Sequence, residues 1–340
     1  FDRMKHWNSP EKIWLDGVLS ATWEWTYNKV ASVDTQAKTI TLAYGELNGL
    51  GQGSQGTVIR PHFHFENIPE EIDRPGEYFI DRKKGLLYLY PPTNFASSPI
   101  TLATSSEALF SMHNAKHINF DGLFFNTGRH LALEVKDSEH ITIKNTTIAN
   151  FVKGGVKIKG SHNKVINSHI YGVGGYGVYL DGGNKTTLKA GSNSVESCEI
   201  HDFGWDQKSQ IPGVFLNGVG NSVRHCKIYD APHFAIRLRN TNDCIVEHNE
   251  VFDLPKYHHY DGGAIYLTTG HQPQCRGNKI SHNYLHDIPT NGIYADNFSW
   301  GVLVNNNLFE RVGNTGFKYK AVNMNGGGQC LTQNNIMLDC

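Results

Sequence analysis

A short phrase recurs along the last two thirds of the chain and restricts the fold more than any other feature. It reads apolar residue, two residues, a small polar residue or Cys, one residue, apolar residue, as in Val246-Glu-His-Asn249-Glu-Val251. Its fourth position recurs at steps of 22 to 34 residues and gives this column: Asp121, Thr146, Ser168, Cys198, Cys226, Asn249, Asn283, Asn307 and Asn335. A period of this length indicates a chain of stacked coils.

A second phrase follows most copies of the first and alternates apolar with polar residues, as in Val178-Tyr-Leu180 and Ile265-Tyr-Leu267. This is the period of a β-strand, and no 3.6-residue period separates the strands. Two or three short strands per coil predict an all-β fold, a parallel β-helix of about nine coils.

The chain is rich in Asn and Gly, with 35 Gly and 31 Asn, and 26 of these Asn follow residue 110. Equivalent residues of successive coils stack about one strand spacing apart, near ~4.8 Å, so inward Asn side chains can hydrogen-bond from coil to coil. We expect most Asn to be scaffold and Gly to supply the positive backbone angles at the corners. Cys198 and Cys226 occupy adjacent coils, as a stack of thiols or as a disulfide.

Composition excludes several classes of function. The formal net charge is −1, which disfavours a nucleic-acid binder, and 39% hydrophobic residues can bury a large interior. No apolar run approaches the roughly 18 residues of a membrane span. The six Cys form no CxxC pair, so we expect no metal site and no cofactor. Calcium has no motif here, although Glu247 and Glu250 could contribute ligands.

Residues 1–100 lack the repeated phrase and predict a β-rich module packed on the coil. A strand–turn–strand signal occupies residues 77–81 and 86–90. Residues 101–340 form the predicted β-helix. The chain begins at Phe1 without a signal-peptide pattern and ends just after an apolar stretch, so we expect it to be cut from a longer protein at both ends.

Outward residues of the second phrase would line a long, shallow groove that suits a linear polymer. The first outward column contains Lys157, Tyr179, Phe215, Arg237, Tyr266 and Tyr294. The next contains Lys159, Asp181, Asn217, Arg239, Thr268 and Asp296. Aromatic faces can stack on sugar rings and Arg can bind carboxylate or sulfate, so Tyr179, Arg237, Arg239, Tyr266 and Tyr294 are candidate substrate-binding residues.

The longest coil, from Asn249 to Asn283, and its neighbours hold the candidate catalytic groups. These are Asp261, Asp296 and His233, with His258 and His259 in the long loop and His259 a candidate for substrate binding. Two carboxylates in unlike surroundings could serve as acid and as base or nucleophile in glycoside hydrolysis. A fully extended strand would, however, hold Asp261 and Asp296 farther apart than the roughly 5–9.5 Å that such a pair needs.

The chain resembles right-handed parallel β-helix carbohydrate-active proteins, and among them glycoside hydrolase family 141, which has fucosidase and xylanase activities. The resemblance rests on the run from Pro75 to Pro91, on Pro232-His233, on Asp261-Gly-Gly-Ala-Ile-Tyr266 and on Gly292-Ile-Tyr-Ala-Asp296. It implies a right-handed coil and a catalytic pair at Asp261 and Asp296. The set Arg237/Arg239 and Lys318/Lys320 departs from the family and favours an anionic glycan.

Three functions remain open from the sequence. The first is a glycoside hydrolase acting on a complex, anionic polysaccharide through the two aspartates. The second is a polysaccharide lyase or C5 epimerase, in which Arg237 neutralises a uronate and His233, His259 or Tyr266 removes the C5 proton. The third is a non-catalytic glycan-binding β-helix. The resemblance places the protein outside the cell, in the periplasm or in a lumen.

Overall fold

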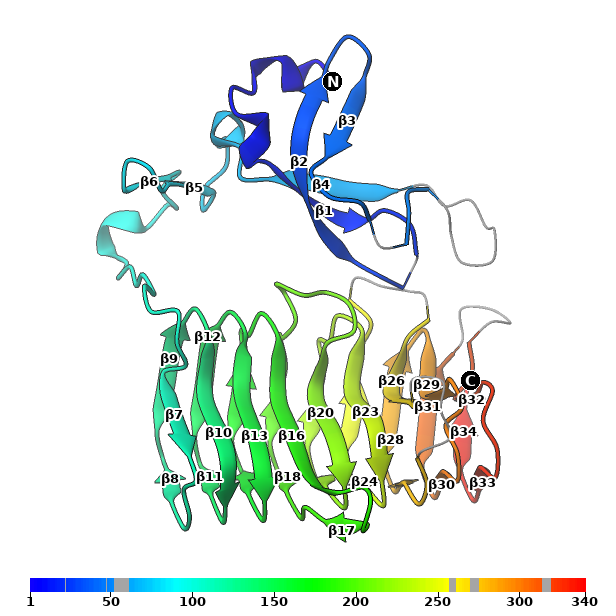
Figure 1. Cartoon of the computed structure of the whole chain (residues 1–340). Helices are drawn as coiled ribbons and strands as arrows, with labels where there is room; N and C mark the ends of the chain where they lie inside the picture. Colours follow the sequence, from blue (N-terminus) through cyan, green and yellow to red (C-terminus); the bar gives the residue numbers. More distant parts are fainter. Residues whose placement is uncertain (22, 47, 52–60, 257–260, 270–274, 314–318) are drawn as a thin grey trace. The chain divides into compact units, whose positions relative to one another are not determined.

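The computed structural model describes residues 1–340 except residues 22, 47, 52–60, 257–260, 270–274 and 314–318 (Figure 1). The chain forms two compact units, Phe1–Thr101 and Leu102–Cys340. Among the described residues, no helix is long and apolar enough to cross a membrane.

The first unit contains a four-stranded antiparallel sheet in the order β3-β2-β1-β4 and a separate β5-β6 hairpin. Its elements are η1 (Arg3–His6), η2 (Pro10–Lys12), β1 (Trp14–Val18), β2 (Thr26–Asp34), β3 (Thr39–Leu42), β4 (His62–Glu66), η4 (Pro69–Glu71), β5 (Tyr78–Asp81), β6 (Leu86–Leu89) and η5 (Phe95–Ser97). Ile13, Leu15 and Val30 form the centre of a small core. The predicted strand–turn–strand signal is confirmed by β5 and β6, within one residue at the ends that differ.

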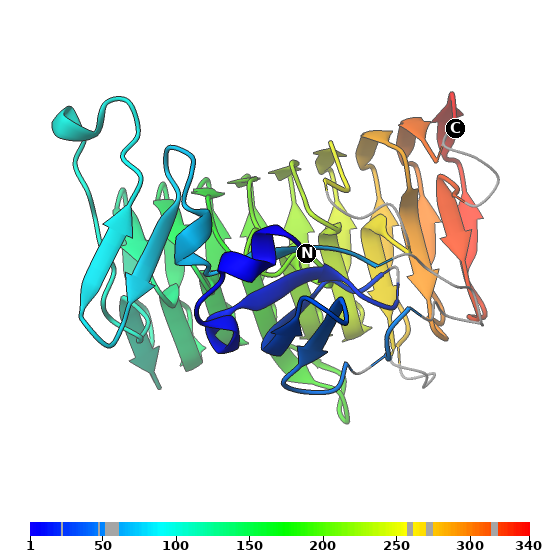
Figure 2. The same ribbon diagram turned by 90° about the horizontal axis from the view of Figure 1, so that it is seen from above.

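The second unit is a parallel β-helix with three sheets, and successive coils follow one another in chain order (Figures 1 and 2). Sheet 1 contains β7 (Phe110–His113), β10 (Leu131–Glu139), β13 (Gly154–Ser161), β16 (Tyr176–Asn184), β20 (Pro212–Val219), β23 (Phe234–Asn242), β26 (Gly263–Thr268), β29 (Asn291–Asp296) and β32 (Val322–Met324), with β17 (Lys189–Ala190) paired to β16. Sheet 2 contains β8 (Asn119–Asp121), β11 (Thr142–Lys144), β14 (Lys164–Ile166), β18 (Ser194–Glu196), β21 (Ser222–Arg224), β24 (Ile245–Glu247), β27 (Lys279–Ser281), β30 (Leu303–Asn305) and β33 (Leu331–Gln333). Sheet 3 contains β9 (Phe124–Gly128), β12 (Thr147–Phe151), β15 (His169–Tyr171), β19 (Glu199–Ile200), β22 (Lys227–Ile228), β25 (Glu250–Phe252), β28 (Tyr284–Ile288), β31 (Leu308–Val312) and β34 (Ile336–Leu338).

The alternation of the second phrase is confirmed in sheet 1. Val178 and Leu180 of β16, like Ile265 of β26, have no exposed surface, while the residue between each apolar pair points outward. Strand pairing joins the first outward column in the predicted order, from Lys157 to Tyr294. Burying one apolar side chain of this size contributes roughly 1.5–3 kcal/mol, so the repeated inward pairs hold the coils together.

The predicted Asn ladder is confirmed in the last four coils. The side-chain amide nitrogens of Asn249, Asn283 and Asn307 each donate to the amide oxygen of the next Asn at 2.9, 3.0 and 3.0 Å, ending at Asn335. The same oxygens accept backbone N–H groups, at 3.0 Å for Asn249 N to Asn283. Each coil therefore satisfies the buried polar groups of its neighbour.

Two further features of the scaffold are its free cysteines and the residues at the corners of the coils. Cys198 and Cys226 are free and buried, so the thiol stack holds rather than the disulfide. The expectation that Gly supplies the positive angles is wrong at the corner before the ladder column. From the second coil onward this corner is occupied by Asn145, Asn167, Ser197, His225, His248, His282, Asn306 and Asn334, with φ from 46 to 58°. Asn and His enter the left-handed region more readily than other residues with a side chain.

Candidate functional site

The outward face of sheet 1 brings four predicted site residues together at β26 and β29. Tyr266 of β26 and Tyr294 of β29 are register partners. Asp296 lies two residues after Tyr294 and therefore on the same face of the strand. Asp261 lies two residues before β26, at a corner with φ 54°, where the chain leaves the extended conformation. Both aspartates thus flank the same two tyrosines.

The hydrogen bonds of this group cross from coil to coil. The Tyr266 hydroxyl donates to Asp296 Oδ2 at 2.8 Å, and the Tyr294 hydroxyl donates to Asp261 Oδ1 at 3.1 Å. Asn325 Nδ2 donates to Asp296 Oδ1 at 2.7 Å and lies 3.5 Å from the Tyr294 hydroxyl. We call Asp261, Tyr266, Tyr294, Asp296 and Asn325 the Tyr–Asp cluster.

This cluster limits the distance between the two carboxylates. Contacts of 3.1, 3.5 and 2.7 Å lead from Asp261 Oδ1 through the Tyr294 hydroxyl and Asn325 Nδ2 to Asp296 Oδ1. The two oxygens are therefore no more than about 9.3 Å apart, which is below the upper limit of roughly 9.5 Å for a glycosidase pair. An extended strand would have held the two carboxylates farther apart. The chain turns at Asp261, and the Tyr294 side chain spans the distance that remains.

The two aspartates have different surroundings. Asp296 is 3% exposed and accepts three donors, the Tyr266 hydroxyl and the side-chain amides of Asn297 (2.7 Å) and Asn325 (2.7 Å). Asp261 is half-buried and lies at the corner of the coil. Three donors directed at two oxygens suit a carboxylate anion, because an anion accepts hydrogen bonds and donates none.

Burial also changes the acidity of the two tyrosines. Desolvation raises the pKa of Tyr266 well above its usual value, and the nearby charge of Asp296 raises it further. Desolvation followed by the charges of Asp261 and Asp296 raises the pKa of Tyr294 in the same way. Both phenols therefore stay protonated at neutral pH and act as hydrogen-bond donors.

Arg237 supports the site from the preceding coil. Its guanidinium lies 5.5 Å from the ring centres of Phe215 and Phe234 and 5.7 Å from that of Tyr266. It donates from Nη1 to the backbone oxygen of Gln210 at 2.7 Å. Desolvation lowers the pKa of Arg237 to about 10, and only 9% of the residue is exposed. This guanidinium therefore offers little surface to a polymer and packs as a cation–π partner.

The other predicted residues lie around the cluster. His233 has no exposed surface, its ring stacks on Phe234 at 3.9 Å between centres, and its Nδ1 accepts the Gln210 N–H at 3.1 Å. Arg239 is exposed on the outward face of β23, in register with Thr268.

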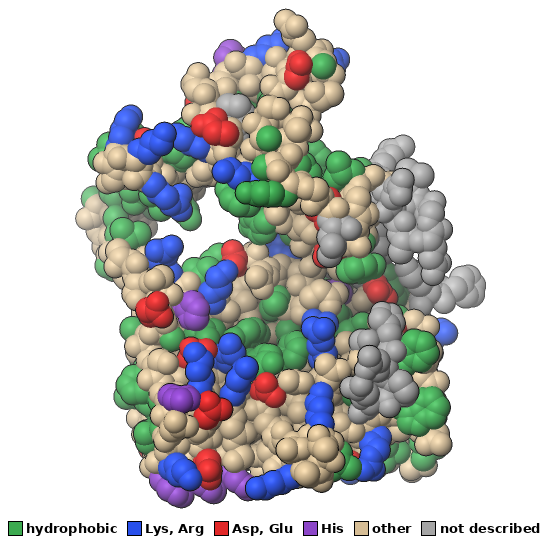
Figure 3. Space-filling view, viewed as in Figure 1, with side chains coloured by type: hydrophobic (Ala, Val, Ile, Leu, Met, Phe, Trp, Pro, Cys, Tyr) green, Lys and Arg blue, Asp and Glu red, His purple; other side chains and the backbone are tan. Residues whose placement is uncertain are grey.

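Tyr179 belongs to an earlier part of sheet 1 and stacks on Phe215 at 4.9 Å. Charged side chains of both signs gather on the face over β10, β13 and β16 (Figure 3), where Lys136 and Lys157 pair with Glu134 at 2.9 and 3.6 Å. Three candidates from the sequence, His258, His259 and Lys318, lie outside the described residues.

The sequence did not reveal two of the residues that donate hydrogen bonds to Asp296, namely Asn297 and Asn325. Asn297 directly follows Asp296. Asn325 follows β32, whose Met324 is in register with Ala295, so Asn325 takes the position next to Asp296 in the following coil. The alternation Val322-Asn-Met-Asn325 would have revealed it as one more member of the outward column.

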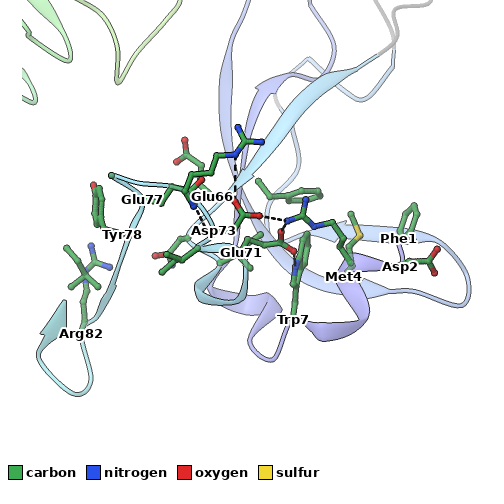
Figure 4. A pocket seen from close by; sticks show the side chains of 18 residues that line it. Phe1, Asp2, Met4, Trp7, Glu66, Glu71, Asp73, Glu77, Tyr78 and Arg82 are labelled. Atoms are coloured by element: carbon green, nitrogen blue, oxygen red, sulfur yellow. Dashed lines mark hydrogen bonds and ion pairs between the residues drawn. The ribbon is translucent and has the colours of Figure 1, made fainter. Parts of the chain in front are cut away.

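A separate cavity of about 1070 Å³ lies inside the first unit (Figure 4). Two of its carboxylates, Glu71 and Glu77, have partners among the residues that line the cavity. Glu71 accepts the indole N–H of Trp7 at 2.8 Å and pairs with Arg3, and Glu77 accepts the backbone N–H groups of Asp73 and Arg74 at 2.8 and 2.9 Å. These carboxylates form ion pairs and turn contacts, and the catalytic candidates lie on the second unit.

Comparisons with known proteins agree with the architecture. The family described as "Right handed beta helix region" matches residues 154–337, more than half of the chain, and so confirms the predicted right-handed coil. A solved structure described as "Glycoside hydrolase" is 14% identical, with a TM-score of 0.70 over 96% of this chain and 68% of that chain. The A-module of the mannuronan C-5 epimerase AlgE6 from Azotobacter vinelandii is 12% identical, with a TM-score of 0.50 over 64% of this chain and 58% of that one. A search of curated protein sequences finds no match. The resemblance to family 141 stays a prediction.

Proposed function

The chain belongs to the right-handed β-helix family, and from this premise we propose that it is a glycoside hydrolase acting on a complex polysaccharide through Asp261 and Asp296. The observation that carries the proposal is the Tyr–Asp cluster, in which two carboxylates no more than about 9.3 Å apart share two protonated tyrosines. The fold shared with a glycoside hydrolase over 96% of the chain supports it.

The surroundings of the two aspartates suggest their roles. Asp296, which accepts three donors, serves as nucleophile or as the base that activates water. Asp261, whose Oδ1 accepts the Tyr294 hydroxyl, is the proposed acid that protonates the leaving oxygen. Two carboxylates in unlike environments are the arrangement that separates an acid from a base at one pH.

Exposed cations in the outward column that ends at Asp296 favour an anionic substrate. Strand pairing places Lys159, Asp181, Asn217, Arg239 and Thr268 in the outward column that ends at Asp296. Lys159 and Arg239 are exposed in this column. An extended glycan lying along the column would bring its carboxylate or sulfate groups to these two side chains.

Elimination or epimerisation of a uronate would require a base near C5. The phenols of Tyr266 and Tyr294 have raised pKa values and already donate to carboxylates, which opposes proton abstraction by either. His233 is already engaged, because its Nδ1 accepts the Gln210 N–H and its ring stacks on Phe234. These observations oppose Tyr266 and His233 as the base of a lyase or epimerase, while His259, the third candidate, lies outside the described residues.

The test compares Asp261→Asn and Asp296→Asn with the wild type on a panel of neutral and anionic polysaccharides. New reducing ends report hydrolysis, and ultraviolet absorbance reports the unsaturated uronate left by elimination. We expect each variant to lose turnover by about 10²- to 10⁴-fold, the usual contribution of an acid or base.

Asp253→Asn is the matched control, because Asp253 has the same φ of 54° as Asp261 and lies exposed in the same coil. Full turnover by both catalytic-site variants would refute the proposal. Unsaturated products would indicate a lyase, and tight glycan binding without any turnover would indicate a non-catalytic binding protein.

A further inference from the structure

Three side chains that can bind a metal ion meet on sheet 3, on a different sheet from the Tyr–Asp cluster. His169 of β15 and Glu199 of β19 are register partners, and His201 directly follows β19. Glu199 and His201 are two residues apart, so they point to the same side of their strand. We propose that His169, Glu199 and His201 form a binding site for one divalent transition-metal ion of the Zn²⁺ type, independent of the proposed hydrolysis.

The geometry suits such an ion. Nε2 of His169 lies 2.8 Å from Nε2 of His201. One ligand atom from each of the three residues lies within 4.8 Å of the other two. Tetrahedral Zn²⁺ with bonds of about 2.0–2.1 Å places its ligand atoms roughly 3.3 Å apart. A shift of a few tenths of an ångström in the positions of the two Nε2 atoms would therefore convert the two imidazoles from a hydrogen-bonded pair into two metal ligands.

Neighbouring side chains hold the three ligands in place. The Tyr229 hydroxyl donates to Glu199 Oε1 at 2.9 Å, which leaves Oε2 to bind a cation. The His201 ring is stacked between Tyr171 and Tyr229, with centre distances of 5.5 and 4.7 Å and interplanar angles of 5 and 13°. Metal sites depend on such outer contacts because they fix the orientation of the ligands before the ion arrives.

The charges around the site also favour a cation. Asp202 and Asp230 act on His201 through their negative charge. Lys227, the register partner of Glu199, is an opposing positive charge, and its ammonium lies over the rings of Tyr229 and Phe252, at 5.6 and 5.3 Å.

Other histidines of the β-helix have a different arrangement. His225, His248 and His282 stack in parallel at 5.0 and 4.9 Å between ring centres, as expected for equivalent corners of successive coils. Among the described residues, one further group of potential metal ligands lies close together, Asp16, His64 and Glu66 of the first unit. There a single imidazole nitrogen lies 3.2 Å from each of two carboxylates, the arrangement of a histidine bridging two acids.

The experiment uses the full chain, stripped with a chelator and titrated with Zn²⁺ by calorimetry and with Co²⁺ by visible absorption. We expect one Zn²⁺ per chain and a Co²⁺ spectrum of low coordination number, together with a rise in melting temperature. His169→Gln and His201→Gln should each weaken Zn²⁺ binding by more than about tenfold, and Glu199→Gln by roughly tenfold.

His248→Gln and His64→Gln are the matched controls, because they remove an imidazole from a stacked corner and from the second ligand group. Both should bind Zn²⁺ as the wild type does. The proposal is overturned if the wild type binds no Zn²⁺, if only six-coordinate Co²⁺ appears, or if His64→Gln removes the binding. Should a histidine variant not fold, as judged by circular dichroism, Glu199→Gln and the wild-type Co²⁺ spectrum still decide the question.

Discussion

The Asn ladder inside the β-helix and the Tyr–Asp cluster on its outer face belong to the same last coils, and both join neighbouring coils through side-chain hydrogen bonds. The ladder repeats one residue type and one bond, so each Asn is satisfied by the next. The cluster combines Asp, Tyr and Asn in bonds that do not repeat. The repeated bond of the ladder holds neighbouring coils together. The unlike partners in the cluster give Asp261 and Asp296 different surroundings. Positions that depart from the repeat are therefore the candidates for chemistry in this fold.

The largest effect on stability is expected from breaking the ladder. Asn283→Ala removes the acceptor of Asn249 and the donor to the Val246 carbonyl, which leaves buried polar groups without partners. We expect the free energy of unfolding to fall by about 2–5 kcal/mol in urea denaturation.

Asn167→Ala is the control, because Asn167 makes an exposed side-chain contact of 2.7 Å to Asn145 at a corner with φ 46°. It should cost about 1–2 kcal/mol, mostly from the left-handed backbone. Equal losses in the two variants would contradict the distinction between a buried and an exposed row.

A smaller change is expected from Tyr294→Phe, this time in activity. The variant removes the hydroxyl that orients Asp261, so turnover of the polysaccharide should fall about tenfold, while the free energy of unfolding changes by less than about 1 kcal/mol. Tyr284→Phe on sheet 3 likewise removes a phenol bound to a carboxylate, that of Glu310, and should leave turnover unchanged. A loss of stability without any loss of turnover would place Tyr294 with the scaffold.

Asn325 allows a finer test of the same cluster. Asn325→Ala removes one of three donors to Asp296, and we expect turnover to fall about fivefold. Asn325→Asp should be more damaging, because a second carboxylate would face Asp296 where a donor lies at 2.7 Å. The measurement is the steady-state turnover rate of each variant on the same substrate. Asn325→Asp with wild-type turnover would show that the charge of Asp296 is not used.

The smallest effect is a dependence of stability on alkaline pH. The pKa of Tyr266 is raised in the folded chain above the unfolded value of about 10. The stabilisation by protonated Tyr266 is therefore complete below pH 10 and is lost as the pH rises toward the folded pKa. At about pH 10.5 the loss in the free energy of unfolding amounts to roughly 1 kcal/mol. Urea midpoints between pH 8 and pH 11 should decline less steeply in Tyr266→Phe than in the wild type. Parallel curves would mean that Tyr266 titrates normally.

The fold followed from the sequence because a β-helix repeats the same inward and outward positions in every coil. Spacing alone aligned Lys157 with Tyr294 through six strands, and strand pairing reproduces this order. The Asn ladder followed for the same reason. A repeat specifies which residues are equivalent, and equivalent residues of neighbouring coils must be in contact.

Contacts between non-equivalent positions were harder to predict. Arg237 was expected to face the groove, but three aromatic rings and the Gln210 carbonyl enclose its guanidinium. His169 and Glu199 occupy equivalent positions, directly after Ser168 and Cys198, yet the third ligand His201 lies two residues farther along. Side-chain length and the direction of a corner decide such diagonal contacts, and neither is visible in the spacing of a repeat.

The sequence by itself determined the coil, the register of its strands and the short set of outward residues in which chemistry could lie. The repeated phrase did so, because coils of 22 to 34 residues can stack in only one alignment that keeps the repeated apolar residues inside. Only the tertiary structure decided that Asp261 and Asp296 share one cluster. Their separation depends on the turn at Asp261 and on a tyrosine side chain that reaches from β29 to the neighbouring coil. The rise per residue of an extended strand, which is all that the sequence spacing gives, does not predict this shorter separation of the two carboxylates.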